Sequence, residues 1–308
     1  MSDHDVSQLV GGHLSIDIMA LCSVAVVQMT STNDKAGNLQ TAERLVREAK
    51  ARGASFVALP ECCNFFGLDS AESVAAAEDL GGEGIAAWSA MASRHAVWLA
   101  LGGIKVVSDE PARPTNSHLL IAPNGSIVAR YDKVHLFDID LPAATFMESA
   151  YTKGGTELVC ADTALGRVGL STCYDLRFPS LYAALTQRGG AEIVLVPAAW
   201  TSKTFPHWEI LLRARAIETQ SYIIAAAQVG RHSANRTSPG GAMIVDPWGT
   251  VVARCEGERE SVAVATLDLE HVRALRRRMP LAAHAQPDVY ASEVRVVVAA
   301  DEHVPDGR

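Results

Sequence analysis

The sequence predicts an α/β fold made of two mixed β-sheets that pack together, with helices on the outside. Strand and helix signals alternate along the chain from residue 23 onward. Hairpin signals are mixed with strand–helix–strand units, which indicates sheets with both antiparallel and parallel neighbours. The strands are also more numerous than one sheet carries comfortably, so we expect two sheets with a shared core.

The predicted strands are short apolar runs bounded by turn residues. In chain order they span residues 23–29, 55–59, 97–107, 117–122, 126–131, 158–162, 167–172, 193–196, 222–228, 242–245, 251–253 and 262–267. Pro123-Asn124-Gly125 separates two of these runs and is a strong hairpin signal. Asp246-Pro247-Trp248-Gly249 predicts a second turn.

Helices are predicted where apolar residues recur every three or four positions. They span residues 38–52, 83–95, 178–188, 207–219 and 270–278. The stretch 132–156 has no clear period and is too long for a plain connector. Because long segments of this kind are often functional, we expect it to contribute to a site.

Charge and composition limit the partners of this chain. Its 308 residues are 48% hydrophobic and 20% charged, which is ordinary for a globular protein. The formal net charge is -8, and the densest basic cluster, Arg276-Arg277-Arg278, fits the last turn of a helix. We therefore expect no nucleic-acid partner. An acidic protein also does not attract anions through its overall field, so an anionic substrate needs local cations.

The cysteines and the apolar runs argue against a metal site and a membrane span. The six cysteines show no paired zinc-site spacing; they are Cys22, Cys62, Cys63, Cys160, Cys173 and Cys255. No apolar run reaches about 18 residues, so we expect no membrane partner. The start of the chain lacks a secretory signal and is polar, and we expect a cytoplasmic protein. We expect an N-terminal extension at residues 1–20, a single domain at 21–293 and a C-terminal tail at 294–308.

Three chemically active residues share one position relative to the predicted strands. Glu61, Lys133 and Cys173 each come directly after a strand, and Cys173 also precedes a helix. In α/β proteins, catalytic groups gather where strands end and loops begin. A helix N-terminus favours a thiolate, and its free N–H groups can bind an oxyanion. Together the three residues fit the nucleophile, base and oxyanion-stabilising roles of acyl transfer.

Each of these residues alone also has an ordinary structural interpretation. A cysteine at a strand end is usually a core residue, and a lone lysine or glutamate is usually solvated. A cysteine–histidine pair is the main alternative chemistry for a thiol hydrolase. Spacing leaves His135 and His207 open as partners of the thiol, because such triads are defined by geometry and not by sequence order.

The motifs that carry these residues resemble the nitrilase, or carbon-nitrogen hydrolase, superfamily. They are AVVQM (25–29), ALPEC (58–62), YDKVHLFDID (131–140), FMES (146–149), GLSTCYDLRFPSLY (169–182), HWEILLRARAIETQ (207–220) and DPWGTVVA (246–253). The match runs in order from about residue 22 to residue 290. RARAIETQ, AAAQVGRH and DPWG are most similar to the Nit branch of this superfamily.

The resemblance implies a four-layer α-β-β-α sandwich, a homodimer or higher homo-oligomer, and no cofactor. It assigns the base to Glu61, the oxyanion-stabilising lysine to Lys133 and the nucleophile to Cys173. The second glutamate of the family falls on Glu148, and the backbone N–H that completes the oxyanion hole belongs to Tyr174. The implied reaction is amide hydrolysis through a thioester on the cysteine.

The Nit branch implies a small anionic amide as substrate, deaminated glutathione, which carries two carboxylates. We expect Arg177, Lys203 and Arg231 to bind these carboxylates, since each lies near a segment that reaches the catalytic end of the sheets. Arg177 has a structural alternative as a partner of Asp175. The alternative functions are an ω-amidase acting on 2-oxo dicarboxylic monoamides, a nitrilase, and an interaction protein that has lost catalysis.

Overall fold

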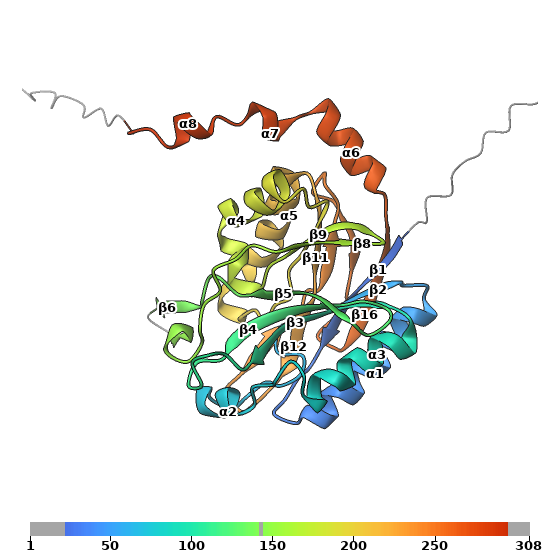
Figure 1. The fold of residues 1–308 in the computed structure, drawn as a ribbon, viewed down its shortest axis with the longest axis vertical. Helices are drawn as coiled ribbons and strands as arrows, with labels where there is room; N and C mark the ends of the chain where they lie inside the picture. Colours follow the sequence, from blue (N-terminus) through green and yellow to red (C-terminus); the bar gives the residue numbers. More distant parts are fainter. Residues whose placement is uncertain (1–21, 142–143, 295–308) are drawn as a thin grey trace, which may run out of the picture.

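Two mixed β-sheets pack face to face, and helices cover both outer faces (Figure 1). The computed structural model describes residues 22–141 and 144–294. The predicted extension at residues 1–20 lies outside the described residues, as does the tail beyond Val294. The predicted two-sheet architecture is confirmed.

The described strands form two main sheets and a separate hairpin. The first sheet runs in the order β13 (Thr237–Pro239), β12 (Ala227–Arg231), β1 (Cys22–Met29), β2 (Phe56–Leu59), β3 (Trp98–Val106), β4 (Thr115–Ile121), β5 (Ile127–Asp132), and β16 (Ser261–Leu267) pairs with β1. The second runs in the order β15 (Val251–Arg254), β14 (Met243–Val245), β11 (Tyr222–Ala225), β10 (Ile193–Leu195), β9 (Gly166–Leu170), β8 (Cys160–Thr163). The hairpin pairs β6 (Asp138–Leu141) with β7 (Ala144–Met147).

Side-chain alternation along β1 explains how the layers hold together. Val24 and Val26 point into the core between the two sheets, while Ala25 and Val27 pack under the helices on the other face. Both faces of the strand are therefore buried, which is why it reads as a continuous apolar run. This shared core supports the proposal that residues 21–293 form one domain.

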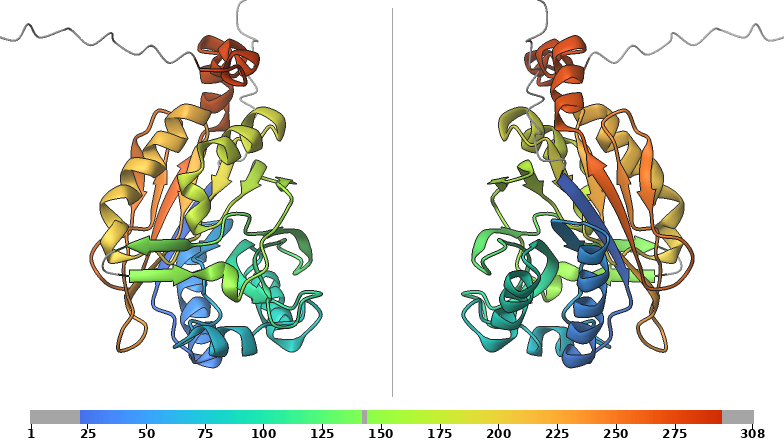
Figure 2. Two further views of the ribbon diagram at one scale, coloured as in Figure 1. Left: turned by 90° about the vertical axis from the view of Figure 1, so that its left-hand side faces the viewer. Right: turned by 90° about the vertical axis from the view of Figure 1, so that its right-hand side faces the viewer.

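Helices lie on both sides of the paired sheets (Figure 2). The helices α1 (Lys35–Ala51) and α3 (Glu83–His95) cover the first sheet, and α4 (Pro179–Ala183) and α5 (Trp208–Thr219) cover the second. The short α2 (Ser70–Ala75) lies near one end of the first sheet. At the other end, α6 (Leu269–Arg278), α7 (Leu281–His284) and α8 (Pro287–Tyr290) lead away from the sandwich.

Two predicted elements differ from the structure. The predicted strand at residues 222–228 is broken at Ala226 into β11 and β12, which belong to different sheets. The chain thus crosses from one sheet to the other within an unbroken apolar run, which a pattern of apolar residues does not reveal. The predicted helix at residues 178–188 is α-helical only over α4 and widens into a π-helical turn at Ala184–Arg188.

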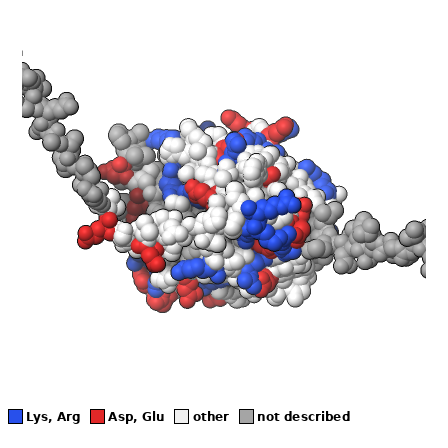
Figure 3. Space-filling view, turned by 90° about the horizontal axis from the view of Figure 1, so that it is seen from above, with Lys and Arg blue, Asp and Glu red and all other residues white. Residues whose placement is uncertain are grey.

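The arginine cluster has the structural role that the sequence predicts. Arg276, Arg277 and Arg278 occupy the last turn of α6. Arg276 donates to backbone carbonyls at Gln220 and Ala191, and Arg277 pairs with Glu270 at 2.6 Å. On the face seen in Figure 3, basic and acidic side chains lie side by side, without an extended basic surface. No helix within the described ranges is long and apolar enough to cross a membrane.

Candidate active site

Cys173 lies at a sharp bend between a strand and a short 3-10 helix. Strand β9 ends at Leu170, and the 3-10 helix spans Cys173–Arg177. The bend requires a left-handed backbone at Cys173, with φ of 49°, which costs roughly 1–3 kcal/mol for a residue with a side chain. The Cys173 N–H donates to the Pro197 carbonyl at 2.9 Å, which anchors the bend to the neighbouring β10 segment.

Glu61 and Lys133 follow β2 and β5 and meet as a buried ion pair. Only 5% of Glu61 and 2% of Lys133 is exposed. The Lys133 Nζ donates to Glu61 Oε1 at 3.1 Å, and the Ala199 N–H donates to Glu61 Oε2 at 3.0 Å. The Cys173 thiol lies close enough to the Glu61 carboxylate for the two groups to interact. The structure thus brings together the three residues that the sequence singled out.

Glu148 and Asn116 complete this cluster, which we call the buried floor: Glu61, Asn116, Lys133, Glu148 and Cys173. The Lys133 Nζ donates to Glu148 Oε2 at 2.9 Å, and the Phe137 N–H donates to the same oxygen at 2.8 Å. The Asn116 amide bridges the two glutamates, donating to Glu61 Oε1 at 2.9 Å and to Glu148 Oε1 at 3.1 Å. Every carboxylate oxygen of the floor is therefore hydrogen-bonded.

The charges of the floor stabilise one another against the cost of burial. Burial alone would lower the pKa of Lys133, but Glu148 and Glu61 outweigh it and hold this pKa well above its usual value. Burial alone would raise the pKa of Glu148, yet Lys133 and Lys105 lower it to about 2. The resting site therefore contains a charged lysine and an ionised Glu148.

The Cys173 thiol does not have the lowered pKa that its position before a helix predicted. Burial raises its pKa well above the usual value, the Glu61 carboxylate adds to the rise, and Lys133 only partly opposes it. The helix that follows is a five-residue 3-10 turn, too short for a substantial dipole. The resting thiol is therefore neutral, and it needs a base to become a nucleophile.

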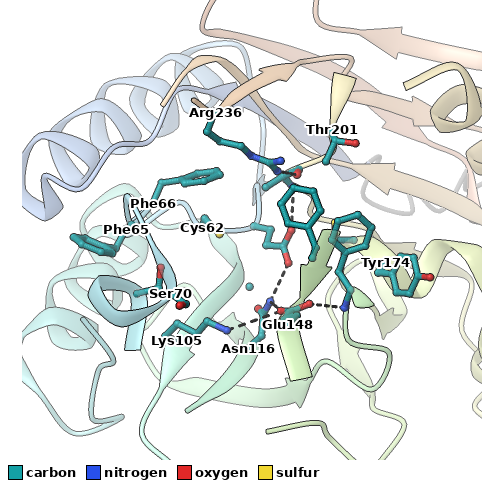
Figure 4. A pocket seen from close by; sticks show the side chains of 18 of the residues that line it. Cys62, Phe65, Phe66, Ser70, Lys105, Asn116, Glu148, Tyr174, Thr201 and Arg236 are labelled. Atoms are coloured by element: carbon teal, nitrogen blue, oxygen red, sulfur yellow. Dashed lines mark hydrogen bonds and ion pairs between the residues drawn. The ribbon is translucent and has the colours of Figure 1, made fainter. Parts of the chain in front are cut away.

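The floor opens into a cavity of about 430 Å³. Figure 4 shows Lys105, Asn116 and Glu148 on one side of this cavity and Arg236 and Thr201 on the other. Aromatic side chains contribute much of the wall; they are Phe65, Phe66, Phe137, Phe146, Tyr151, Tyr174 and Trp200. Tyr174 occupies the second position of the 3-10 helix, where a backbone N–H has no acceptor within the helix.

The three predicted carboxylate-binding cations are placed differently. Arg177 lines the cavity, stacks over the Trp200 ring at 4.9 Å and contacts His207 Nδ1 at 3.1 Å. Lys203 is exposed in the 3-10 helix Ser202–His207 and is not among the residues that line the cavity. Arg231 is also exposed outside the cavity, and its Nε donates to the Ser233 carbonyl.

Among the cavity residues that were not singled out from the sequence are Lys105, Asn116 and Arg236. Lys105 lies on β3 with its Nζ 3.9 Å from Glu148, and Asn116 lies at the start of β4. A lysine in the otherwise apolar strand β3 is a signal that could have found Lys105. Asn116 lies in the polar first half of β4, where its residue type does not distinguish it from its neighbours. Arg236 lies in a turn, and no pattern in the sequence distinguishes it from its neighbours.

Neither histidine considered as a thiol partner pairs with Cys173. The His135 Nδ1 is 2.8 Å from Asp175 Oδ1, and its ring stacks on Phe178 at 3.6 Å between centroids. His207 contacts Arg177. The geometry thus favours a carboxylate and not an imidazole as the base. Within residues 22–141 and 144–294, no group of three or more His, Cys, Asp or Glu side chains could hold a metal ion.

The fold and the site together define a class of protein: a two-sheet sandwich hydrolase with a cysteine beside a buried glutamate and lysine. Residues 23–277 match the family described as Carbon-nitrogen hydrolase, and the chain belongs to that family. The human "Deaminated glutathione amidase" is 46% identical over 275 residues, which cover 87% of this chain and 84% of the human protein.

Two solved structures are similar over most of the chain. The Caenorhabditis elegans NitFhit protein has a TM-score of 0.81 at 42% identity, covering 87% of this chain and 66% of that one. Saccharomyces cerevisiae Nit3, described as a member of branch 10 of the nitrilase superfamily, has a TM-score of 0.76 at 29% identity, covering 84% of this chain and 94% of that one. The chain is therefore a carbon-nitrogen hydrolase, an amidase of the nitrilase superfamily, and the predicted family and fold are confirmed.

Proposed function

We propose that this chain hydrolyses deaminated glutathione at the amide between its 2-oxoglutaryl and cysteinylglycine parts. The observation that carries the proposal is one cavity that contains Cys173, Glu61 and Lys133 together with Arg177. The first three fit the chemistry of amide hydrolysis, and the arginine fits an anionic substrate. The name of the human relative, "Deaminated glutathione amidase", supports the same substrate.

In the first half of the proposed reaction, Glu61 takes the thiol proton of Cys173 and the sulfur attacks the amide carbon. The negative charge that develops on the amide oxygen is stabilised by the Lys133 ammonium and the Tyr174 N–H. One donor of this kind is typically worth about 2.7–4 kcal/mol. Glu61 then gives its proton to the nitrogen of cysteinylglycine, which leaves as an amine while the 2-oxoglutaryl group stays on the sulfur as a thioester.

In the second half, Glu61 takes a proton from a water molecule, which attacks the thioester. The bond to sulfur breaks, 2-oxoglutarate leaves, and Cys173 recovers its proton. The raised pKa of the Cys173 thiol is consistent with this scheme, because a neutral thiol needs the adjacent carboxylate as base.

Glu148 has a positioning role in this proposal. Its Oε2 accepts from both the Lys133 Nζ and the Phe137 N–H, so it holds the ammonium in place. The Lys105 ammonium, 3.9 Å away, helps to keep it ionised. Glu148 thus keeps Lys133 charged and oriented toward the developing oxyanion.

The closest alternative is an ω-amidase that acts on 2-oxo dicarboxylic monoamides, with a nitrilase as a further alternative. Mass spectrometry of the products from deaminated glutathione, such monoamides, neutral amides and nitriles separates these functions. We expect the largest kcat/KM for deaminated glutathione, with release of 2-oxoglutarate and cysteinylglycine. A larger value for a simple monoamide or a nitrile would replace the proposed substrate, and no turnover of any compound would favour the interaction protein.

We also propose that the chain forms a homodimer or a higher homo-oligomer. Ile210, Ile217 and Trp248 are large apolar side chains that are 69%, 46% and 64% exposed. Ile217 on α5 packs against Gly249 in the turn that carries Trp248, so Ile217 and Trp248 lie on one surface. Trp208, by contrast, is fully buried in the core of the chain, where its indole N–H donates to the Gly241 carbonyl.

Sedimentation velocity at micromolar concentration tests this assembly. We expect a dimer or larger species for the wild type and a shift toward monomer for Trp248→Glu. A monomer at all concentrations would overturn the proposed assembly. The predicted cytoplasmic location is likewise a proposal, which fractionation of cells that express the protein tests.

A further inference from the structure

Arg236 is a cationic residue of the cavity that the proposed reaction does not use. It follows β12 in the turn that leads to β13, and the N–H groups of His232 and Ser233 both donate to its carbonyl. This closed turn fixes the backbone at the edge of the first sheet. Figure 4 shows the side chain at the edge of the cavity that faces Lys105 and Asn116 across it.

The Arg236 guanidinium is held in place by neutral partners. One terminal nitrogen donates to the Ala199 carbonyl at 2.7 Å. The Phe66 ring lies 5.6 Å and the Phe146 ring 6.0 Å from its central carbon, within the range of cation–π attraction. Phe66 is itself stacked on the buried His232 at 4.2 Å between centroids. The side chain is therefore pre-organised, which limits the ordering cost of binding a ligand.

The same guanidinium has unused hydrogen-bonding capacity. Its Nε is buried and has no hydrogen-bond partner within the described part of the chain. No carboxylate of the described residues forms an ion pair with Arg236, whereas Lys105 and Lys133 both lie within 4.0 Å of Glu148. The Nε is closed off from solvent, so a ligand in the cavity reaches the terminal nitrogens, of which Nη1 makes no hydrogen bond within the described residues.

The charges that line the cavity favour an anionic ligand at this end. Four lining residues are basic and three are acidic; they are Lys105, Lys133, Arg177 and Arg236, and Glu61, Asp69 and Glu148. The two lysines face the two buried glutamates, and the exposed Asp69 caps α2 by accepting from the Glu72 N–H. The two arginines are thus left without carboxylate partners in the described structure.

We propose that Arg236 binds a carboxylate of the substrate and, with Arg177, makes the enzyme selective for anionic amides. A guanidinium presents paired donors that match a carboxylate, and its charge does not depend on pH in the physiological range. The inference rests on the proposed function, in which the substrate carries one carboxylate on each side of the scissile amide. Two arginines then match two carboxylates.

Arg236 also has an indirect link to the floor that the test must separate from carboxylate binding. Its guanidinium binds the Ala199 carbonyl, and the N–H of the same residue binds Glu61 Oε2. Loss of this link would disturb Glu61 for every substrate alike. Loss of a carboxylate contact affects only anionic substrates.

The experiment compares Arg236→Gln and Arg236→Lys with Arg231→Gln, which removes the same charge from the same hairpin outside the cavity. Three amides are used: deaminated glutathione, the monoamide of 2-oxoglutarate, and neutral butyramide. We expect Arg236→Gln to lower the ratio of anionic to neutral kcat/KM about ten- to a hundredfold, mainly through KM. Arg236→Lys should recover part of this ratio, and Arg231→Gln should leave it within about twofold.

The pattern of loss also locates the carboxylate. A ratio that falls for deaminated glutathione alone assigns Arg236 to the leaving group, and a fall for both anionic amides assigns it to the acyl group. Equal losses on all three amides would overturn the inference in favour of a structural role through Ala199. Thermal melts show whether each variant folds. If Arg236→Gln does not fold, the ratio of anionic to neutral kcat/KM is measured with Arg236→Lys.

A second measurement does not depend on turnover of deaminated glutathione. Alkylation of Cys173 by iodoacetamide is followed with added glutarate, a dicarboxylate, or neutral glutaramide. We expect glutarate to protect the wild type and Arg231→Gln but to protect Arg236→Gln at least tenfold less well. If this holds while deaminated glutathione is not hydrolysed, the proposed function fails and the carboxylate site stands. Equal protection of wild type and Arg236→Gln by glutarate would overturn the site.

Discussion

The buried floor and the two arginines of the cavity differ in how their charges are satisfied. In the floor, Lys133 lies between two carboxylates at 3.1 and 2.9 Å, and both glutamates are nearly inaccessible to solvent. Arg177 and Arg236 instead contact aromatic rings, an imidazole and a backbone carbonyl. The charges of the floor are paired with one another, whereas the charges of the two arginines are available to a ligand.

This difference separates chemistry from selectivity. A closed network keeps its geometry whatever ligand is bound, which suits groups that must be placed for a transition state. Arginines that lack carboxylate partners gain a counter-ion only when an anionic substrate arrives, which suits discrimination between substrates. Substitutions in the floor should therefore affect all substrates, and substitutions of the arginines only the anionic ones.

The largest effect is expected for Cys173→Ala in the floor. The alanine keeps a side chain small enough for the bend and removes the nucleophile, so we expect the fold to persist while kcat falls by about four to six orders of magnitude. Cys173→Ser should be nearly as inactive, because a hydroxyl is much harder to ionise beside Glu61. Steady-state rates on anionic and neutral amides measure both variants. Retention of more than a few per cent of activity would rule out Cys173 as the nucleophile.

The next largest effect is expected for Lys133→Gln. The ammonium acts on charge that exists mainly in the transition state, so kcat should fall about 10²- to 10³-fold while KM changes little. The change also removes the nearest cation from two buried carboxylates and leaves only Lys105, 3.9 Å from Glu148. Breaking a buried ion pair in this way typically costs about 3–5 kcal/mol of folding free energy.

The double variant Lys133→Gln with Glu148→Gln separates these two effects. Removal of one carboxylate should restore part of the stability in urea denaturation but none of the turnover. A change in Lys133→Gln that is confined to KM would instead indicate that Lys133 binds a substrate carboxylate.

The floor was predictable from the sequence because its main residues directly follow strands. Glu61 comes two positions after β2, and Lys133 directly follows β5, so sheet register alone brings them to one edge. Asn116 was missed although it lies at the same edge, because its partners Glu61 and Glu148 are distant from it in sequence. The raised pKa of the Cys173 thiol was also not predictable, because it results from burial and from Glu61, which is distant in sequence.

The arginine positions were predictable only in part. Arg177 lies four residues after Cys173, and the 3-10 helix carries it into the cavity wall. Arg231 and Arg236 lie in one hairpin, and the hydrogen bonds that close its turn leave Arg231 outside and Arg236 at the cavity. Which of the two arginines reaches the cavity depends on backbone geometry that residue types do not encode. The same limit applies at Ala226, where the chain changes sheets.

A smaller and more selective effect is expected for Arg177→Gln. We expect kcat/KM for deaminated glutathione to fall about ten- to a hundredfold, the value of one charge-assisted hydrogen bond, with a much smaller change for butyramide. Lys203→Gln and Arg231→Gln are matched controls that remove a charge outside the cavity, and we expect changes of less than about twofold. Equal losses for the charged and the neutral amide would contradict a carboxylate-binding role for Arg177.

The smallest effect at neutral pH is expected for His118, which is fully buried on β4 and should make the protein less stable in acid. Its Nδ1 is 3.0 Å from the Ser171 carbonyl, and its buried Nε2 has no partner among the described residues. Burial lowers the pKa of His118 to about 4, whereas an unfolded histidine titrates near 6.5. Between these values the unfolded state binds a proton that the folded state does not, so stability falls as the pH drops from 6.5 to 4. The loss amounts to about 3 kcal/mol over this window.

His118→Asn keeps a donor for Ser171 but cannot titrate, so its unfolding free energy should depend less on pH over the same window. Urea denaturation at pH 7, 5.5 and 4 measures this slope, and His284→Asn on the exposed helix α7 controls for the loss of one histidine. A wild-type slope in His118→Asn would show that the acid sensitivity of the protein has another source.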